Sequence, residues 1–403
     1  MRITAPRIVA LLGVIALAIP TASAQHDLGA HPVVNETKHI GYDTLQHAVT
    51  DADPNDLITV GPVQLVEHDI QIDKPLTILG RGPAASSIYA HSDGRCLNIE
   101  TGSQVDRVRI IGLTLRQGRS KGANGGNVRV YNSHAAFEQC VIETGNAQFA
   151  LGGGVYVGFG VATFDGCVIR DNTAVDVAAI YAPGSGVGLT NCIVSGNRAV
   201  GGLNQGIGLS GVNVVSLINC TVSGNGQNAN PGSYLLDNDF MTFVINSIIW
   251  DNGADTFSPD TSFLLLNSSI IQDFVAGGIL NADPLFVDAE AGDFSLSPGS
   301  PAIDAGWNEY LVDPHDQAEF PSYLMLDALR GFRYRDDPGT PDTGAPHESN
   351  VLLATNTPIV DLGAIEFTGV TPDACPADLA PPHGVLDISD VLQYLSDFGA
   401  GCP

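Results

Sequence analysis

Short runs of apolar, largely β-branched residues recur along the middle of the chain, separated by Asn, Gly and Asp. The clearest repeated phrase places Cys before two further apolar residues. It begins at Phe137, Phe164, Leu189 and Leu217, and it returns without Cys at Asn246 and Asn267. Equivalent positions lie 27, 25, 28, 27 and 21 residues apart. An earlier segment, Ile111–Gly118, fits the same frame.

A repeat of this length with no helical periodicity inside it predicts one turn of a solenoid per repeat. Leucine-rich repeats share the period, but their Leu-x-x-Leu-x-Leu signature is missing from this sequence. We therefore expect an all-β fold, a parallel β-helix of about eight coils whose strands pair with the coils above and below.

The repeat places four cysteines at one inward position of successive coils, namely Cys140, Cys167, Cys192 and Cys220. Export to an oxidising compartment would permit disulfides between neighbouring coils. Stacked side chains point the same way, however, and a disulfide needs a particular torsion. We favour a buried row of thiols over disulfides. With 7 Cys in the chain, at least one is unpaired within a monomer.

Asn precedes the Cys position in several repeats, at Asn191, Asn219, Asn246 and Asn267. Asn tolerates the left-handed backbone region better than other residues with a Cβ, so this row predicts a sharp bend. Amides that recur at one bend also predict a stacked, hydrogen-bonded ladder.

The ends of the solenoid need cover, because open strands template aggregation. Tyr42–Val49 predicts a short amphipathic capping helix, while Asp56–Gly61 and Lys74–Gly80 predict the first strands. The repeat is lost from about 281 to 367, so we expect this section to close the rear.

The chain begins with features of a secretory signal peptide. Arg2 and Arg7 precede the apolar run Ile8–Ile19, and Ala22-Ser23-Ala24 offers a cleavage site, so residues 1–24 are excluded from the fold. The apolar run is too short to span a bilayer, and no later segment has the length of a membrane span. We expect a secreted mature chain, extracellular or at the cell surface.

The chain is strongly acidic, with 44 Asp and Glu against 17 Lys and Arg and a formal net charge of −27. Nucleic acid is a poor partner, since its binding depends on basic residues that displace counterions from phosphates. Acidic polysaccharides would also be repelled unless a divalent cation intervened. The charge either keeps an exported protein soluble or supplies carboxylates to surface calcium sites.

The segment 38–280 resembles the pectin-lyase-like superfamily of right-handed parallel β-helices. Four later blocks resemble the closing section of the choice-of-anchor Q proteins: Ala282–Asp288, Gly292–Gly306, Arg335–Gly344 and Val360–Glu366. That resemblance implies architecture and export, but it implies no reaction. The expected domains are the β-helix with its cap at 25–280, the closing section at 281–370 and a C-terminal module at 371–403.

The C-terminal module, which is bracketed by Cys375 and Cys402, resembles half of a type I dockerin, in which a calcium-binding loop precedes a helix. The resemblance implies calcium as a cofactor, with Asp378, Asp387 and Asp390 as ligands, and a cohesin-like or sorting partner. The loop is one residue longer than the pattern and lacks its Asn and Asp ligands in the middle. The alternative is a metal-free helix held by a Cys375–Cys402 disulfide.

Enzymes of this superfamily are expected, by resemblance, to carry carboxylates and a basic residue beside the first strand of each coil. The sequence motifs of polygalacturonases, namely Asn-Thr-Asp, a catalytic Asp-Asp, Gly-His-Gly and Arg-Ile-Lys, are absent from the coils. The weak charged candidates for acid–base or metal chemistry are Asp237 and Asp239, with Arg170, Asp171 and Asp176 on neighbouring coils. The ten His residues show no metal-ligand spacing.

Counting ten residues back from each bend gives an aromatic and apolar row at Tyr156, Tyr181, Leu209 and Leu236. This row is either a platform on which sugar rings stack or ordinary packing.

Two functions remain open. The first is a non-catalytic, exported protein that binds glycans or cell-surface partners. The second is a polysaccharide lyase or glycoside hydrolase that acts on acidic polysaccharide, with calcium as a candidate cofactor.

Overall fold

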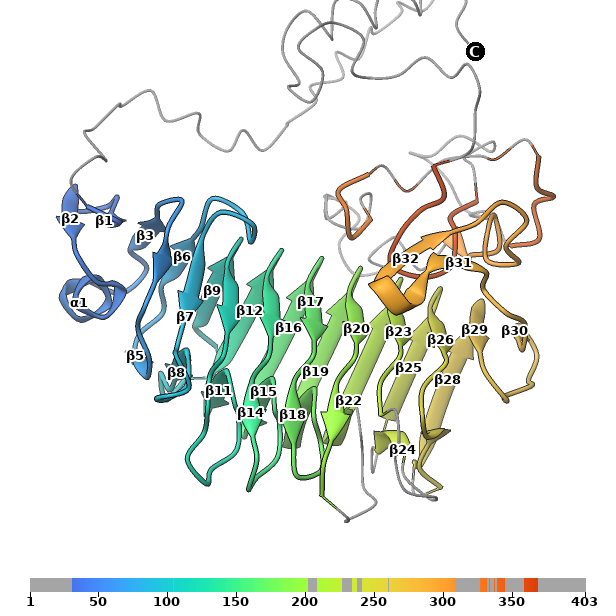
Figure 1. Cartoon of the computed structure of the whole chain (residues 1–403), viewed down its shortest axis with the longest axis horizontal. Helices are drawn as coiled ribbons and strands as arrows, with labels where there is room; N and C mark the ends of the chain where they lie inside the picture. Colours follow the sequence, from blue (N-terminus) through green and yellow to red (C-terminus); the bar gives the residue numbers. More distant parts are fainter. Residues whose placement is uncertain are drawn as a thin grey trace, which may run out of the picture.

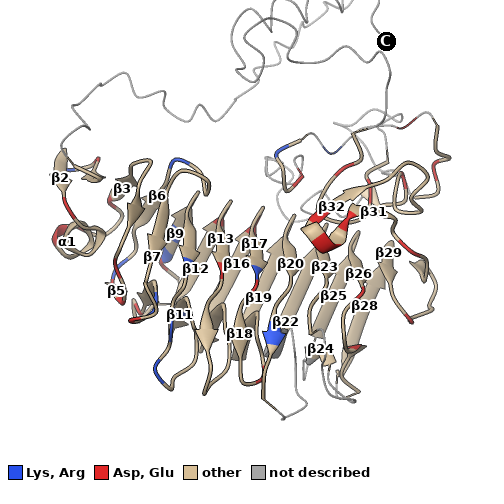
Figure 2. Ribbon diagram, viewed as in Figure 1, with Lys and Arg blue, Asp and Glu red and all other residues tan. Residues whose placement is uncertain are grey.

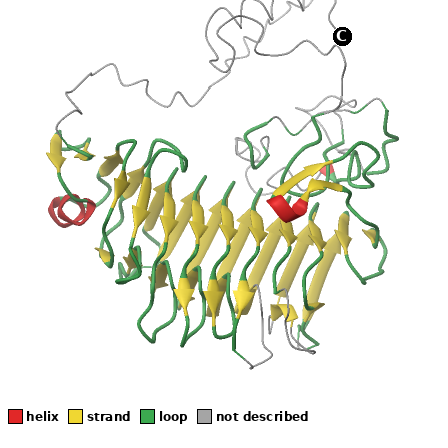
Figure 3. Cartoon of the chain, viewed as in Figure 1, coloured by secondary structure: helices red, strands yellow, loops and turns green. Residues whose placement is uncertain are grey.

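The computed structural model describes residues 31–103, 105–201, 209–226, 234–237, 241–259, 261–308, 327–331, 333, 337, 339–344 and 359–368. These residues form a β-solenoid with a single short α-helix at one end of the described chain (Figures 1 and 3). Each turn contributes two strands to a 17-stranded sheet and one to a 10-stranded sheet, and some turns add one to a 3-stranded sheet.

The 17-stranded sheet consists of β1 (Val33–Asn35), β2 (Ile40–Tyr42), β3 (Leu57–Val60), β5 (Ile70–Ile72), β6 (Thr77–Leu79), β8 (Leu97–Ile99), β9 (Arg107–Ile111), β11 (Val128–Tyr131), β12 (His134–Glu138), β15 (Val155–Gly158), β16 (Val161–Asp165), β19 (Ile180–Thr190), β22 (Leu209–Ile218), β24 (Tyr234–Asp237), β25 (Met241–Ile245), β27 (Asp255–Phe257) and β28 (Phe263–Asn267).

The 10-stranded sheet consists of β4 (Gln64–Leu65), β7 (Ser87–Tyr89), β10 (Thr114–Arg116), β13 (Val141–Glu143), β17 (Val168–Arg170), β20 (Ile193–Ser195), β23 (Thr221–Ser223), β26 (Ile248–Trp250), β29 (Ser269–Ile271) and β30 (Ile279–Leu280). The 3-stranded sheet consists of β14 (Asn146–Ala147), β18 (Thr173–Ala174) and β21 (Arg198–Ala199). All strands of the 10-stranded sheet pair in parallel, as the repeat predicts.

The number of coils differs from the expected eight. The repeated phrase marks about six regular turns, and the 10-stranded sheet extends beyond them at both ends. The predicted equivalence of Asn267 with Asn246 at the bend was also wrong. Ile248 pairs with Ile270, so Ser268, and not Asn267, is the counterpart of Asn246. Ser268 has φ 39 and takes the bend, because its neighbour Ser269 occupies the inward position.

The cap also differs in detail from the prediction. Helix α1 (Leu45–Asp51) begins at Leu45 because Tyr42 ends the strand β2 and Thr44 serves as the N-cap. The carboxylate of Glu67 accepts hydrogen bonds from the first two backbone amides of the helix, at 2.7 and 3.0 Å. Leu45, Ala48 and Val49 are buried against the first turn. Antiparallel pairing of β1 with β2 and β3 completes the cap.

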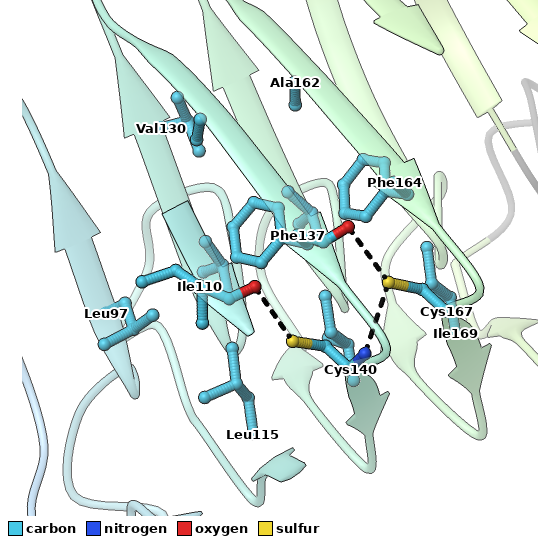
Figure 4. Close-up of a cluster of buried hydrophobic side chains, with 14 of the residues drawn as sticks. Leu97, Ile110, Leu115, Val130, Phe137, Cys140, Ala162, Phe164, Cys167 and Ile169 are labelled. Atoms are coloured by element: carbon cyan, nitrogen blue, oxygen red, sulfur yellow. Dashed lines mark hydrogen bonds between the residues drawn. The ribbon is translucent and has the colours of Figure 1, made fainter. Parts of the chain in front are cut away.

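The inward cysteines form a row of free, buried thiols. The backbone amide of Cys140 donates to the Sγ atom of Cys167 at 3.4 Å (Figure 4), and that of Cys167 donates to Cys192 at 3.4 Å. Ser247 continues the row, with its Oγ atom 3.0 Å from the amide of Cys220. The row therefore stacks through backbone-to-side-chain hydrogen bonds, and no cysteine in the described residues forms a disulfide.

The bend asparagines adopt the predicted left-handed backbone, with φ 54, 52 and 50 at Asn191, Asn219 and Asn246. The amides of Asn219 and Asn191 lie 3.3 Å apart, whereas that of Asn246 bonds to the backbone of Trp307. Contacts with the closing section thus replace part of the expected ladder.

A longer asparagine ladder, not foreseen at this position, lies at the opposite end of the strands of the 10-stranded sheet. Its members are Asn127, Asn172, Asn197, Asn225 and Asn252. From Asn172 onward, each Nδ2 donates to the Oδ1 of the next turn at 2.9 to 3.0 Å. Each of these Oδ1 atoms also accepts the backbone amide of the preceding ladder residue.

The closing section packs along the side of the solenoid and not only over its end, as Figure 1 shows. It contains the antiparallel strands β31 (Phe286–Asp288) and β32 (Asp293–Leu296) and the 3₁₀-helix η1 (Ala289–Ala291). Its apolar residues cover outward side chains of the 10-stranded sheet, including Ile193, Ile248 and Ile270.

A buried ion pair holds the closing section against the bend of the solenoid. The guanidinium of Arg333, which is fully buried, lies 2.6 Å from Glu366 and donates to the backbone of Gly363 and to the Oδ1 atom of Asn191. Asp361 accepts the backbone amides of Asp304 and Phe367. These acidic residues of the closing blocks therefore serve the packing of the section.

Interrupting the asparagine ladder should destabilise the fold. Asn197→Ala removes the bonds to Asn172 and Asn225 and leaves buried backbone groups without partners, so the free energy of unfolding should fall by about 3 kcal/mol in urea denaturation. The exposed Gln71→Ala is the control and should change it by less than about 0.5 kcal/mol. A loss for Asn197→Ala as small as that of the control would contradict a structural role for the ladder.

The stability of the fold should depend on the protonation of Asp361. Burial raises the pKa of its carboxyl to about 6, and the amides of Asp304 and Phe367 oppose the rise. An acid whose pKa is higher when folded binds its proton more tightly in the folded state, so the fold gains stability as pH falls through about 6 toward the unfolded value.

Thermal unfolding at about pH 5 and about pH 8 tests this point. The wild-type chain should unfold at higher temperature at about pH 5, and Asp361→Asn should reduce the difference. An unchanged difference in Asp361→Asn would show that this carboxyl is not the group that titrates.

Candidate functional site

A row of outward side chains crosses neighbouring turns of the 17-stranded sheet. Asn98 pairs with Arg129, Arg129 with Tyr156, and Tyr156 with Tyr181. The flanking residues on the same strands, such as Val128 and Val155, are fully buried. Because side chains alternate along a strand, the row points away from the core.

Tyr156 and Tyr181 lie side by side on consecutive turns. Their ring centroids are 5.9 Å apart with an interplanar angle of 36°. Partial burial raises the pKa of both phenols, and the carboxylate of Asp176 adds to the rise at Tyr181. The pair therefore presents a half-buried aromatic surface with its hydroxyl groups protonated at neutral pH.

Glycine makes room for the first ring of this pair. A Cβ atom at Gly158 would lie 2.5 Å from the Tyr156 hydroxyl and 2.9 Å from the ring of Tyr131. The missing side chain lets the phenol of Tyr156 lie across its own strand toward Tyr131.

Two further rings extend the surface. Tyr131 contacts Phe159 edge to face, with centroids 5.7 Å apart and planes at 88°. The guanidinium of Arg129 lies 4.5 Å from the Tyr131 centroid, and Glu100 holds this guanidinium at 2.7 Å. We call Tyr131, Tyr156, Phe159 and Tyr181 the aromatic face.

Phe159 has an unusual backbone for its residue type. Its φ is 52, in the left-handed region, which costs a residue with a Cβ about 1–2 kcal/mol. Its side chain is 61% exposed, so burial offsets little of that cost. No repeat pattern in the sequence marks such a residue.

The structure corrects the predicted row beyond Tyr181. Leu209 pairs with Ile180, and Leu236 pairs with Leu209, so these leucines belong to a different row from the tyrosines. Leu236 is 1% exposed and packs in the core. The cause is a shorter turn at β22: Asn191 lies ten residues after Tyr181, whereas Asn219 lies nine residues after Ser210, the partner of Tyr181, so a count of ten back from the bend falls one residue short of the row.

The charged candidates do not form one group. By backbone register, Asp237 takes the position of Tyr181 two turns along, because Tyr181 pairs with Ser210 and Ser210 with Asp237. Arg170 lies in the 10-stranded sheet, where it pairs with Glu143 at 2.7 Å, and Asp171 occupies the bend after it. Figure 2 shows where charged residues lie along the ribbon.

The remaining site predictions are not tested by the described residues. Asp239, the calcium ligands Asp378, Asp387 and Asp390, and the cysteines Cys375 and Cys402 all lie outside them. Within the described ranges no three His, Cys, Asp or Glu side chains gather as metal ligands. The calcium site and the disulfide therefore stay predictions.

Helices in the described part of the chain lack the length and apolar character of a membrane span.

Comparison with known proteins supports the fold. Residues 95–275 match a family model described as the right handed beta helix region, in agreement with the predicted right-handed parallel β-helix. A search of curated proteins found no match. Among solved structures, the chain is similar to a pectin methylesterase crystallised in complex with a hexasaccharide. That similarity has 13% sequence identity and a TM-score of 0.41, and it covers 65% of this chain and 96% of the other.

Proposed function

We propose that this chain is an exported β-helix protein that binds neutral glycans on its aromatic face without cleaving them. The observation that carries the proposal is the outward pair Tyr156 and Tyr181, in register on neighbouring turns, with Tyr131 and Phe159 beside it. Aromatic rings on a half-exposed surface supply contact area at a low cost in side-chain entropy.

The chemistry of a sugar ring suits this surface. A pyranose has an apolar face of C–H groups and an edge of hydroxyls. The tyrosine rings offer the apolar contact, and the row supplies hydrogen-bonding groups at Asn98 and Arg129 on the adjoining turns. Turns are spaced by about 4.8 Å, so successive rings meet a ligand that extends along the solenoid at regular intervals.

The electrostatics of the face favour neutral over acidic glycans. The charge of Arg129 is compensated by Glu100 at 2.7 Å, and the chain as a whole carries a formal charge of −27. A uronate would therefore meet a surface that repels anions at long range and offers an arginine already engaged by a carboxylate.

The carboxylates near the face support binding over hydrolysis. Glycoside hydrolysis uses an acid and a base carboxyl group that flank the scissile bond. Glu100 is paired with Arg129, and Asp176, beside Tyr181, is 5% exposed. Neither is presented to a sugar as an open acid or base.

Export and tethering belong to the same proposal. The signal peptide at 1–24 supports secretion, and the four blocks that resemble choice-of-anchor Q proteins support a role at the cell surface. The dockerin-like module at 371–403 supports a sorting or cohesin-like partner, with calcium at Asp378, Asp387 and Asp390 as a candidate ion.

Calorimetric titration with neutral oligosaccharides tests the binding. We expect Tyr156→Ala and Tyr181→Ala each to weaken binding roughly tenfold, because each removes one ring of the platform. Tyr89→Ala is a matched control: Tyr89 also lies near an arginine, at 5.5 Å, but belongs to the 10-stranded sheet. A loss in the control as large as in the two variants would reject the aromatic face as the site.

The same samples separate binding from cleavage. Incubation of neutral and acidic polysaccharides with the chain, with and without Ca²⁺, should release no new reducing or unsaturated ends. Such ends would contradict the non-catalytic part of the proposal and favour the lyase or hydrolase alternative.

A further inference from the structure

Three consecutive turns form the same bend with different residues. Tyr131 pairs with Gly158, and His134, Val161 and Gly186 pair in order beyond the bend. The residues at the bend itself are Asn132, Phe159 and Gly184, with φ 45, 52 and 62.

The outer two of these bends use residues suited to the conformation. Glycine enters the left-handed region without steric cost, and asparagine is several-fold enriched there. A bulky aromatic residue in this region is an outlier. Strained backbone of this kind persists where the surroundings impose it, and it clusters at functional sites.

The local sequence is built to present the ring of Phe159. A Cβ at Gly158 would collide with the phenol of Tyr156, and a Cβ at Gly160 would lie 2.3 Å from the backbone oxygen of Ser133. Glycine on both sides therefore allows the close approach of neighbouring groups, while the exposed ring between them contacts Tyr131 at 5.7 Å.

Core packing does not explain this residue. Phe159 is 61% exposed, unlike Phe137 and Phe164, which stack at 5.1 Å inside the solenoid. The backbone of Phe159 is therefore strained, although its ring is not buried in the core.

We propose that Phe159 is a specificity-determining residue of the aromatic face, which fixes the register of a bound glycan along the solenoid. Tyr156 and Tyr181 repeat along the stacking direction and leave that register open. Phe159 occurs on one of the three compared turns, beside Tyr131, so a sugar ring seated against it is placed at that turn. This inference rests on the proposed glycan binding.

The test replaces Phe159 by the residue that the preceding turn uses. Phe159→Asn should leave the melting temperature unchanged or raise it, because Asn suits φ 52, and should weaken binding of a neutral oligosaccharide about tenfold. Phe159→Tyr keeps the ring and should bind within about twofold of the wild-type chain. Phe263→Ala, which truncates a 48% exposed phenylalanine on β28, is the control and should bind as the wild type does.

The outcomes separate the two proposals. Wild-type affinity in Phe159→Asn, together with loss in Tyr156→Ala, would overturn this inference and leave glycan binding intact. A melting temperature that falls together with affinity in Phe159→Asn would also overturn it, because Phe159 would then be structural. Failure of the wild-type chain to bind any neutral glycan would instead remove the proposed function itself.

Discussion

Each turn of the solenoid sets a side chain directly over its counterpart in the preceding turn, at the spacing of parallel strands, about 4.8 Å. Whatever stands at one position must therefore be compatible with a copy of itself or with a complementary partner. Inside, thiols and hydroxyls meet this requirement, since Cys192 accepts from the amide of Cys167 much as Ser247 accepts from that of Cys220. Asparagine meets it at the bends, because its amide both donates and accepts.

The same constraint orders the outside of the molecule. Like charges repel at this spacing, and the chain places opposite charges on adjoining turns in Glu143 with Arg170 and Glu100 with Arg129. Where it stacks Glu138 on Asp165, burial and the neighbouring carboxylate raise the pKa of Asp165 to about 6. Uncharged rings stack without repulsion, and Tyr156 with Tyr181 is the outward example. The aromatic face thus follows from the rule that shapes the core, applied to residues that contact solvent. Phe159 is an exception, because the residues at the same bend on the adjoining turns, Asn132 and Gly184, have no ring to stack with it. This exception is the strongest indication of a function at this position.

Features that depend on repetition could be predicted from sequence, and features that depend on one turn or on distant packing could not. The thiol row and the bend at Asn191 follow from recurrence of the phrase. The count back from the bend failed at β22, which has one residue fewer than β19 between the row and the bend, since such a count assumes equal turns. The place of the closing section rests on the buried contact of Arg333 with Asn191, which are remote in sequence. A phenylalanine with positive φ has no signature, so Phe159 emerged only from the structure.

The central claim is that the aromatic face is a glycan-binding surface. A crystal structure of the full chain with a neutral oligosaccharide tests it most directly. The account predicts a sugar ring lying on Tyr156 and Tyr181, with its edge against Phe159. A sugar seated on another surface of the solenoid, with the aromatic face left to solvent, would contradict it.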